Sequence, residues 1–146
     1  MTEDKLVIKR ISRFSKKTLK DLNTLALQIS SRKYQMTASH LKSLLKNKNV
    51  YLMGLYDGNK IVGTITLFQA FQITGHKGYL EDLVLDEKYR GRGLGKKLVL
   101  HMIKLAKSLK IYNLKLKSEP HRVAANALYK KLGFETEKAN VYNVKL

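Results

Sequence analysis

The chain has 146 residues, 44% of them hydrophobic, which is enough for a single domain over residues 1–146 with its own core. It contains no cysteine, which excludes disulfides, thiolate metal sites and a cysteine nucleophile. No apolar run reaches the roughly 18 residues that a membrane helix needs, and the N-terminal MTEDKLVIKR is too charged for a signal peptide. We therefore expect a soluble cytoplasmic protein with no membrane partner.

The net charge of +18 comes mainly from the two ends of the sequence. Residues 1–50 hold 12 Lys and Arg against 3 acids, and residues 90–146 hold 14 against 3, whereas residues 51–89 hold 3 against 5. A basic surface favours anionic ligands and salt-sensitive association with nucleic acid. The lysines are interspersed, without the aromatic residues of a base-stacking surface, so a solvated surface is favoured over a nucleic-acid- or ribosome-associated binding module.

The first fifty residues predict one strand and two helices. Residues 6–11, LVIKRI, are typical of a strand. Ser15 is a candidate cap for a helix whose apolar residues recur at helical spacing up to Ile29. Thr37 is a candidate cap for a second, shorter helix through Leu45.

The next segment predicts antiparallel strands. Residues 50–56 and 61–71 are rich in β-forming residues, and Asp57-Gly58-Asn59 joins them, which predicts a hairpin. Gly75 and Gly78 predict a second turn before the following strand.

The stretch from Gly78 to Leu98, GYLEDLVLDEKYRGRGLGKKL, combines a strand, a turn and a helix start. Its strand, residues 79–85, carries two adjacent acids, Glu81 and Asp82. Glycine lets a ligand approach the backbone closely, and the free N–H groups of a helix start point at an anion. The stretch therefore predicts a site for a phosphorylated ligand, formed by Arg90, Gly91, Arg92, Gly93, Leu94, Gly95 and Lys96.

Beyond the glycines the pattern predicts a helix, a strand, a helix and closing strands. An apolar stripe at helical spacing begins at Leu94, residues 112–117 alternate as in a strand, and a helix from Pro120 ends at Gly133. Closing strands are predicted over 134–136 and 141–146. A strand–helix–strand unit around the glycine turn implies a right-handed crossover and a locally parallel pair inside a mixed sheet.

The glycine segment fits neither of two common phosphate-binding motifs. The loop G-x-x-x-x-G-K-[ST] ends in Ser or Thr, but Lys97 follows Lys96 here. The dinucleotide motif G-x-G-x-x-G has a different spacing, and it needs an acid about 20 residues later, where this chain has Lys115 and Lys117.

Two motifs together resemble the GNAT superfamily of N-acetyltransferases. The family signature [RQ]-x-x-G-x-[GA], which follows a strand with a bulge, stands here as Arg90 to Gly95. A second family phrase, A-x-x-L-Y-x-x-x-G-F, stands at the fitting separation within residues 124–134. The resemblance implies an α/β (α+β) fold with a mixed central β-sheet of six to seven strands flanked by about four helices. It also implies acetyl-CoA as co-substrate and an amine as acceptor.

The resemblance also indicates which residues contact coenzyme A. The backbone from Arg90 to Lys96 would bind the pyrophosphate at the helix start. The pantetheine arm would lie along Leu83, Val84 and Leu85 as an added strand does, and a bulge would free N–H groups there. Asn126 stands where family members often bond the cofactor, and a solvated helix residue is an equal alternative.

Direct transfer of acetyl to an amine in a ternary complex needs a base, an acid and oxyanion donors. Glu81 is the candidate base, directly or through water, since several family members place a catalytic Glu two residues before the cofactor strand. Asp82 ranks second, because successive strand residues point to opposite faces unless a bulge intervenes. Tyr129 stands at the family's acid position for the leaving thiolate, and a ring packed between helix and sheet is its alternative. The N–H groups of Leu83 and Leu85 would face the oxyanion.

The histidines His40, His76, His101 and His121 show no metal-ligand spacing, so no metal site is predicted. His76 alone remains a further candidate base, because it lies just before the central strand. The residues leave open whether the acceptor is a small amine or a protein amine, and whether the chain is a monomer or a homodimer.

Overall fold

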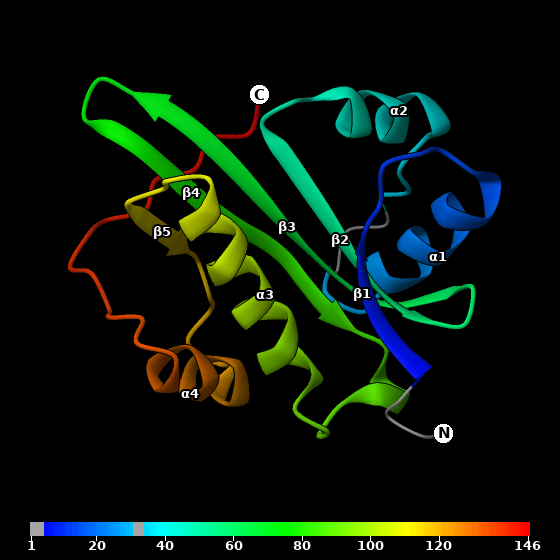
Figure 1. Ribbon diagram of the computed structural model, residues 1–146. Helices are drawn as coiled ribbons and strands as arrows, with labels where there is room; N and C mark the ends of the chain where they lie inside the picture. The colour runs from blue at the N-terminus through cyan, green and yellow to red at the C-terminus, as the bar shows by residue number, and fades with distance from the viewer. Residues whose placement is uncertain (1–4, 31–33) are drawn as a thin grey trace.

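The computed structural model describes residues 5–30 and 34–146, whose elements are drawn in Figure 1. A 3₁₀ turn over Glu87–Tyr89 precedes the glycine-rich segment. In chain order the strands and helices are β1 (Leu6–Arg10), α1 (Lys16–Ala26), α2 (Ala38–Lys46), β2 (Val50–Asp57), β3 (Lys60–Gln72), β4 (Gly75–Leu85), α3 (Leu94–Ser108), β5 (Asn113–Leu116) and α4 (Val123–Lys131).

The described strands form a mixed five-stranded sheet in the order β1-β2-β3-β4-β5. Neighbouring strands from β1 to β4 are antiparallel, whereas β4 and β5 are parallel. The predicted β2–β3 hairpin and the parallel pair around the glycine turn are therefore confirmed. Within the described residues four α-helices flank the sheet, as the resemblance implied.

The prediction of six to seven strands was wrong, because residues 134–136 and 141–146 form no strand. Their alternating apolar residues suit a strand, but an extended segment joins a sheet only when a neighbour takes its hydrogen bonds. The side chains of Tyr142 and Leu146 instead stay in solvent, with relative exposures of 87% and 115%.

The predicted turn between Gly75 and Gly78 was also wrong, because both residues lie inside β4. The chain reverses at residues 73–74. A Cβ at Gly78 would lie 3.0 Å from the side chains of both Leu67 and Leu114. Glycine is required here for close packing between strands, which a sequence pattern cannot distinguish from a turn.

Both predicted N-caps are present. The hydroxyl of Ser15 accepts a hydrogen bond from Thr18 N at 2.9 Å, and that of Thr37 accepts one from His40 N at 3.1 Å. The last helix begins at Val123, later than the predicted Pro120, and Gly133 follows its end with φ +90°.

Two hydrophobic cores lie on the two faces of the sheet, with α3 and α4 on one side and α1 and α2 on the other (Figure 1). Leu98 and Met102 of α3 are fully buried on the first face, and Leu41 of α2 is fully buried on the second. Each such side chain contributes about 1.5–3 kcal/mol of burial free energy. Leu80 of β4 belongs to the first core and Val84 to the second, so β4 is fixed between them. No helix of the described residues is long and apolar enough to cross a membrane.

Candidate active site

The parallel pairing of β4 with β5 ends before β4 does. It runs from Lys77 opposite Asn113 to Leu80 opposite Leu116. Beyond Leu80, β4 continues to Leu85 with no strand partner on this edge among the described residues. Backbone groups that face this edge are therefore available to a ligand that lies beside it as a strand would, except Leu85 O, which already accepts a hydrogen bond from Arg90 Nε.

A β-bulge interrupts β4 at the start of this free edge. Thr66 pairs with Glu81 and Thr64 pairs with Val84, so β4 has one more residue than β3 in this interval. Asp82 lies in the bulge with φ +52°, in the left-handed region. The bulge that the resemblance implied is thus present, although its left-handed residue was not predicted.

The bulge brings two acids into one cleft. In a regular strand only one of two successive side chains faces a given side. Here both Glu81 and Asp82 line an open cleft of about 160 Å³. Tyr129 of α4 lines the same cleft, which therefore contains every candidate acid and base except His76. Its other lining residues are Ile29, Ile65, Leu80, Leu83, Leu116, Lys117 and Arg122.

The cleft shifts the pKa of both carboxyl groups upward. Glu81 and Asp82 are exposed at the cleft mouth, but the surrounding walls partly remove water from them. This desolvation is the main cause of the raised pKa of Glu81, to which the charge of Asp82 adds and from which Lys117 subtracts. Desolvation alone raises the pKa of Asp82.

Tyr129 is held firmly at the inner wall of the cleft. Its side chain is buried, and its ring meets that of Phe134 edge to face with centroids 5.9 Å apart. Burial raises the pKa of the Tyr129 phenol, while nearby Arg122 lowers it. The phenol is therefore protonated at neutral pH, and it is packed against the sheet as well as facing the cleft.

The glycine-rich segment forms an open turn before α3. Gly91 and Gly93 have φ +75° and +72°, and a Cβ on either would meet no atom within 4 Å. Lys97 N donates to Gly93 O at 3.1 Å, so the amides that precede Lys97 at the helix start have no intrahelical acceptor. The segment offers backbone donors and free space together, which suits a phosphate.

The arginines of the segment are engaged with the protein itself. Arg90 Nε donates to Leu85 O at 3.0 Å, and Arg90 Nη2 donates to Gln28 Oε1 at 3.0 Å. Arg92 Nη2 donates to Lys88 O at 3.0 Å, and the Arg92 guanidinium lies 5.5 Å from the Tyr89 ring centroid. Both side chains therefore brace the turn, in addition to the positive charge that they bring to it.

The remaining residues predicted to bind the cofactor differ in how exposed their side chains are. The side chains of Val84 and Leu94 are buried in the two cores, so neither side chain is open to a ligand. Leu83, Leu85 and Gly95 are half-buried, and Lys96 is exposed on the first turn of α3. Asn126 Nδ2 donates to Glu119 O at 3.0 Å, so this amide holds the loop before α4 and is not simply solvated.

His76 lies outside the cleft. Its ring stacks on Phe71 with centroids 4.2 Å apart, and its Nε2 lies 2.9 Å from Gln69 Oε1. It precedes Glu81 by five residues in β4, which is on the order of 16 Å along an extended strand.

No group of three or more His, Asp or Glu within 5–30 and 34–146 could hold a metal ion.

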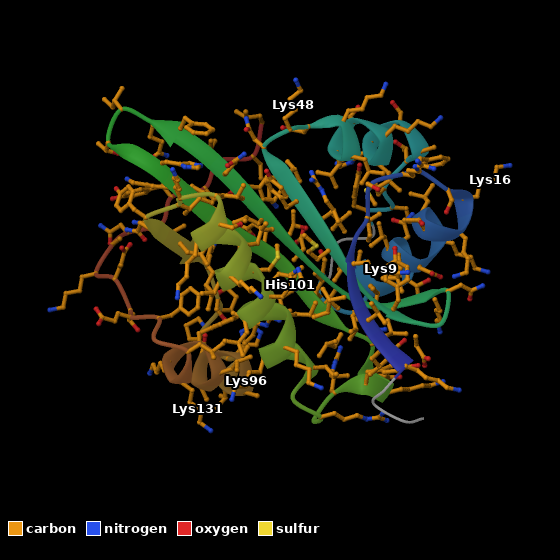
Figure 2. All side chains as sticks on the ribbon, viewed as in Figure 1. Lys9, Lys16, Lys48, Lys96, His101 and Lys131 are labelled. Carbon is orange, nitrogen blue, oxygen red and sulfur yellow. The ribbon has the colours of Figure 1, made fainter. Side chains whose placement is uncertain are left out.

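Lysines on several different elements carry the positive charge in the view of Figure 2. The lysines labelled in Figure 2 belong to β1, α1, α3, α4 and the loop before β2, and Lys16, Lys48 and Lys131 point away from the molecule at different edges of the view. This arrangement favours the solvated-surface interpretation over a continuous track for nucleic acid.

Sequence comparisons place most of the chain in one family. The model of the acetyltransferase (GNAT) family matches residues 17–134. A curated protein from Trypanosoma brucei brucei, glucosamine 6-phosphate N-acetyltransferase, is 39% identical over 57 residues. That match spans 39% of this chain and 37% of the relative.

Solved structures share the fold over nearly the whole chain. An aminoglycoside acetyltransferase from an uncultured soil metagenomic sample has a TM-score of 0.85 and 22% identity, over 99% of this chain and 97% of that one. Glucosamine-6-phosphate N-acetyltransferase from Arabidopsis thaliana has a TM-score of 0.77 and 19% identity, over 95% and 97% of the two chains.

Proposed function

Because the chain belongs to the acetyltransferase (GNAT) family, we propose that it transfers an acetyl group from acetyl-CoA directly to a primary amine in a ternary complex. The observation that carries this proposal is the free edge of β4. It starts at the bulge, passes the cleft that holds Glu81 and Tyr129, and leads through the 3₁₀ turn to the glycine-rich segment.

The residues present suit the two ends of coenzyme A. The open turn at Gly91 and Gly93 presents backbone N–H groups and the start of α3 to the pyrophosphate. The free edge from Leu83 to Leu85 matches the amide groups of the pantetheine arm, which bond a strand edge as a peptide does. The thioester is then next to the bulge.

Glu81 takes the proton from the acceptor amine, directly or through water. An alkylammonium such as that of Lys titrates at about pH 10, whereas an ordinary carboxyl titrates at about pH 4, so the mismatch in proton affinity is large. The raised pKa of Glu81 reduces this mismatch and makes the carboxylate a better base. Asp82 supports the same shift through its charge.

Tyr129 donates a proton to the departing thiolate, and the N–H groups of Leu83 and Leu85 stabilise the charge on the acetyl oxygen. Burial keeps the phenol protonated, as a donor must be. Its fixed ring, packed on Phe134, keeps the hydroxyl in one place during turnover.

A small amine is favoured over a protein amine as the acceptor. The curated relative is named for glucosamine 6-phosphate, and the solved structure with the TM-score of 0.85 is named for aminoglycosides. Both classes are amino sugars, so amino sugars belong first in a substrate screen. The test measures thiol release from acetyl-CoA with a panel of amino sugars, polyamines and lysine-containing peptides. Release with at least one amine, and none without acceptor, supports the proposal, and no release together with no coenzyme A binding contradicts it.

A further inference from the structure

Gln28 joins the end of α1 to the segment between β4 and the glycine turn. Its Oε1 accepts a hydrogen bond from Glu87 N at 3.1 Å and another from Arg90 Nη2 at 3.0 Å. Glu87 starts the 3₁₀ turn and Arg90 follows it. A single amide oxygen therefore bridges the two ends of this turn, from a position about 60 residues earlier in the chain.

Arg90 also connects Gln28 to β4, the strand along which the pantetheine arm would lie. Arg90 Nε donates to Leu85 O at 3.0 Å while its Nη2 donates to Gln28. The guanidinium is planar and rigid, so two acceptors in different directions fix its plane. Leu85, Arg90 and Gln28 thus set the angle at which the chain leaves β4.

Gln28 also caps the turn, together with Asp86. The first N–H groups of a helical turn have no internal acceptor. Asp86 Oδ1 accepts from Lys88 N at 3.0 Å, and Gln28 accepts from Glu87 N. The next residue after Gln28, Ile29, lines the cleft with Glu81. Gln28 therefore contacts the segment that leads into the glycine turn, while the adjacent Ile29 lines the cleft that contains Glu81.

We infer that Gln28 is a positioning residue for acetyl-CoA, an inference that rests on the proposed function. It holds the 3₁₀ turn and Arg90 so that the glycine-turn amides and the free edge of β4 fit the pyrophosphate and the pantetheine arm of the same molecule. Its effect is exerted on the pyrophosphate half, because both of its hydrogen bonds reach the segment that leads into the glycine turn.

The test compares Gln28→Ala with Thr24→Ala, a matched change on α1 that removes only a hydrogen bond to Lys20 O within the same helix. For Gln28→Ala we expect the Kd for coenzyme A, measured by calorimetry, to rise on the order of tenfold, because one lost bond has a charged donor. The KM for acetyl-CoA should rise similarly, with kcat at saturation within about twofold. Thr24→Ala should match the wild-type protein.

A truncated donor separates positioning from general damage. Acetyl-pantetheine lacks the pyrophosphate, so Gln28→Ala should leave its kcat/KM unchanged. An equal loss with both donors, or an unchanged Kd for coenzyme A, overturns the inference. In an Arg90→Ala background the effect of Gln28→Ala should shrink, since the two act through one contact. Absence of coenzyme A binding by the wild-type protein is a different result and contradicts the proposed function itself.

Discussion

Glu81 and Tyr129 line the same cleft from β4 and α4, with Glu81 exposed at the mouth and Tyr129 only 8% exposed. The acid–base chemistry of acetyl transfer to an amine benefits from this division. In the proposed reaction the amine and its proton would exchange with solvent on the Glu81 side. The thiolate would form on the Tyr129 side in a drier environment, where a fixed proton donor is more effective.

Replacement of Glu81 by Gln should slow acetyl transfer without weakening cofactor binding. We expect kcat to fall on the order of 10²-fold, because the amine loses its proton acceptor, while the Kd for coenzyme A stays the same. In the wild-type protein kcat/KM should rise with pH through the raised pKa of Glu81, and this rise should be absent from the variant. Glu135→Gln, an exposed change outside the cleft, is the control. If kcat is unchanged in Glu81→Gln, Glu81 is not the base and another group takes the proton.

Replacement of Asp82 by Asn should move the pH profile in a defined direction. The charge of Asp82 raises the pKa of Glu81, so its removal should shift the acidic limb of kcat/KM to lower pH. Asn is tolerated at φ +52°, so the bulge should persist and Tm should change little. A pH–rate series on both proteins checks this. A shift to higher pH, or none, would contradict the coupling between the two carboxyls.

Sequence patterns predicted the features that depend on neighbouring residues. Ser15 and Thr37 cap helices because each side chain reaches an amide three residues away, and such a pattern is visible in the sequence. The parallel pair of β4 and β5 follows from the strand–helix–strand connection between them. These rules need no knowledge of distant segments.

Structural features that depend on contacts between distant segments were either not predicted from the sequence or predicted wrongly. Nothing near Gln28 indicates that its side chain meets Arg90, because that contact exists only after α1 packs against the sheet. The left-handed Asp82 depends on the register between β3 and β4. The closing segment 141–146 has strand-like alternation, but alternation does not provide a neighbour to pair with.

Tyr129→Phe should lower kcat while leaving stability nearly unchanged. The ring and its contact with Phe134 remain, so only the proton donor is lost. We expect kcat to fall on the order of 10²-fold with an unaltered Kd for coenzyme A. Tyr142→Phe, at a ring that is 87% exposed, is the control and should have wild-type kcat. If both variants keep full activity, the Tyr129 ring serves packing alone.

Gly93→Asp should abolish coenzyme A binding, because it places a carboxylate where the helix start faces the pyrophosphate. Gly58→Asp is a close match, since Gly58 also has a positive φ, of +60°, and no atom within 4 Å of its Cβ position. The two variants add the same charge at backbone positions with similar positive φ, so a difference in coenzyme A binding reports the position of that charge. Calorimetry with coenzyme A should give no measurable heat for Gly93→Asp and wild-type heat for Gly58→Asp. Equal affinity in the two would mean that the glycine turn before α3 does not hold the phosphates, and the free β4 edge would then lack its anchor.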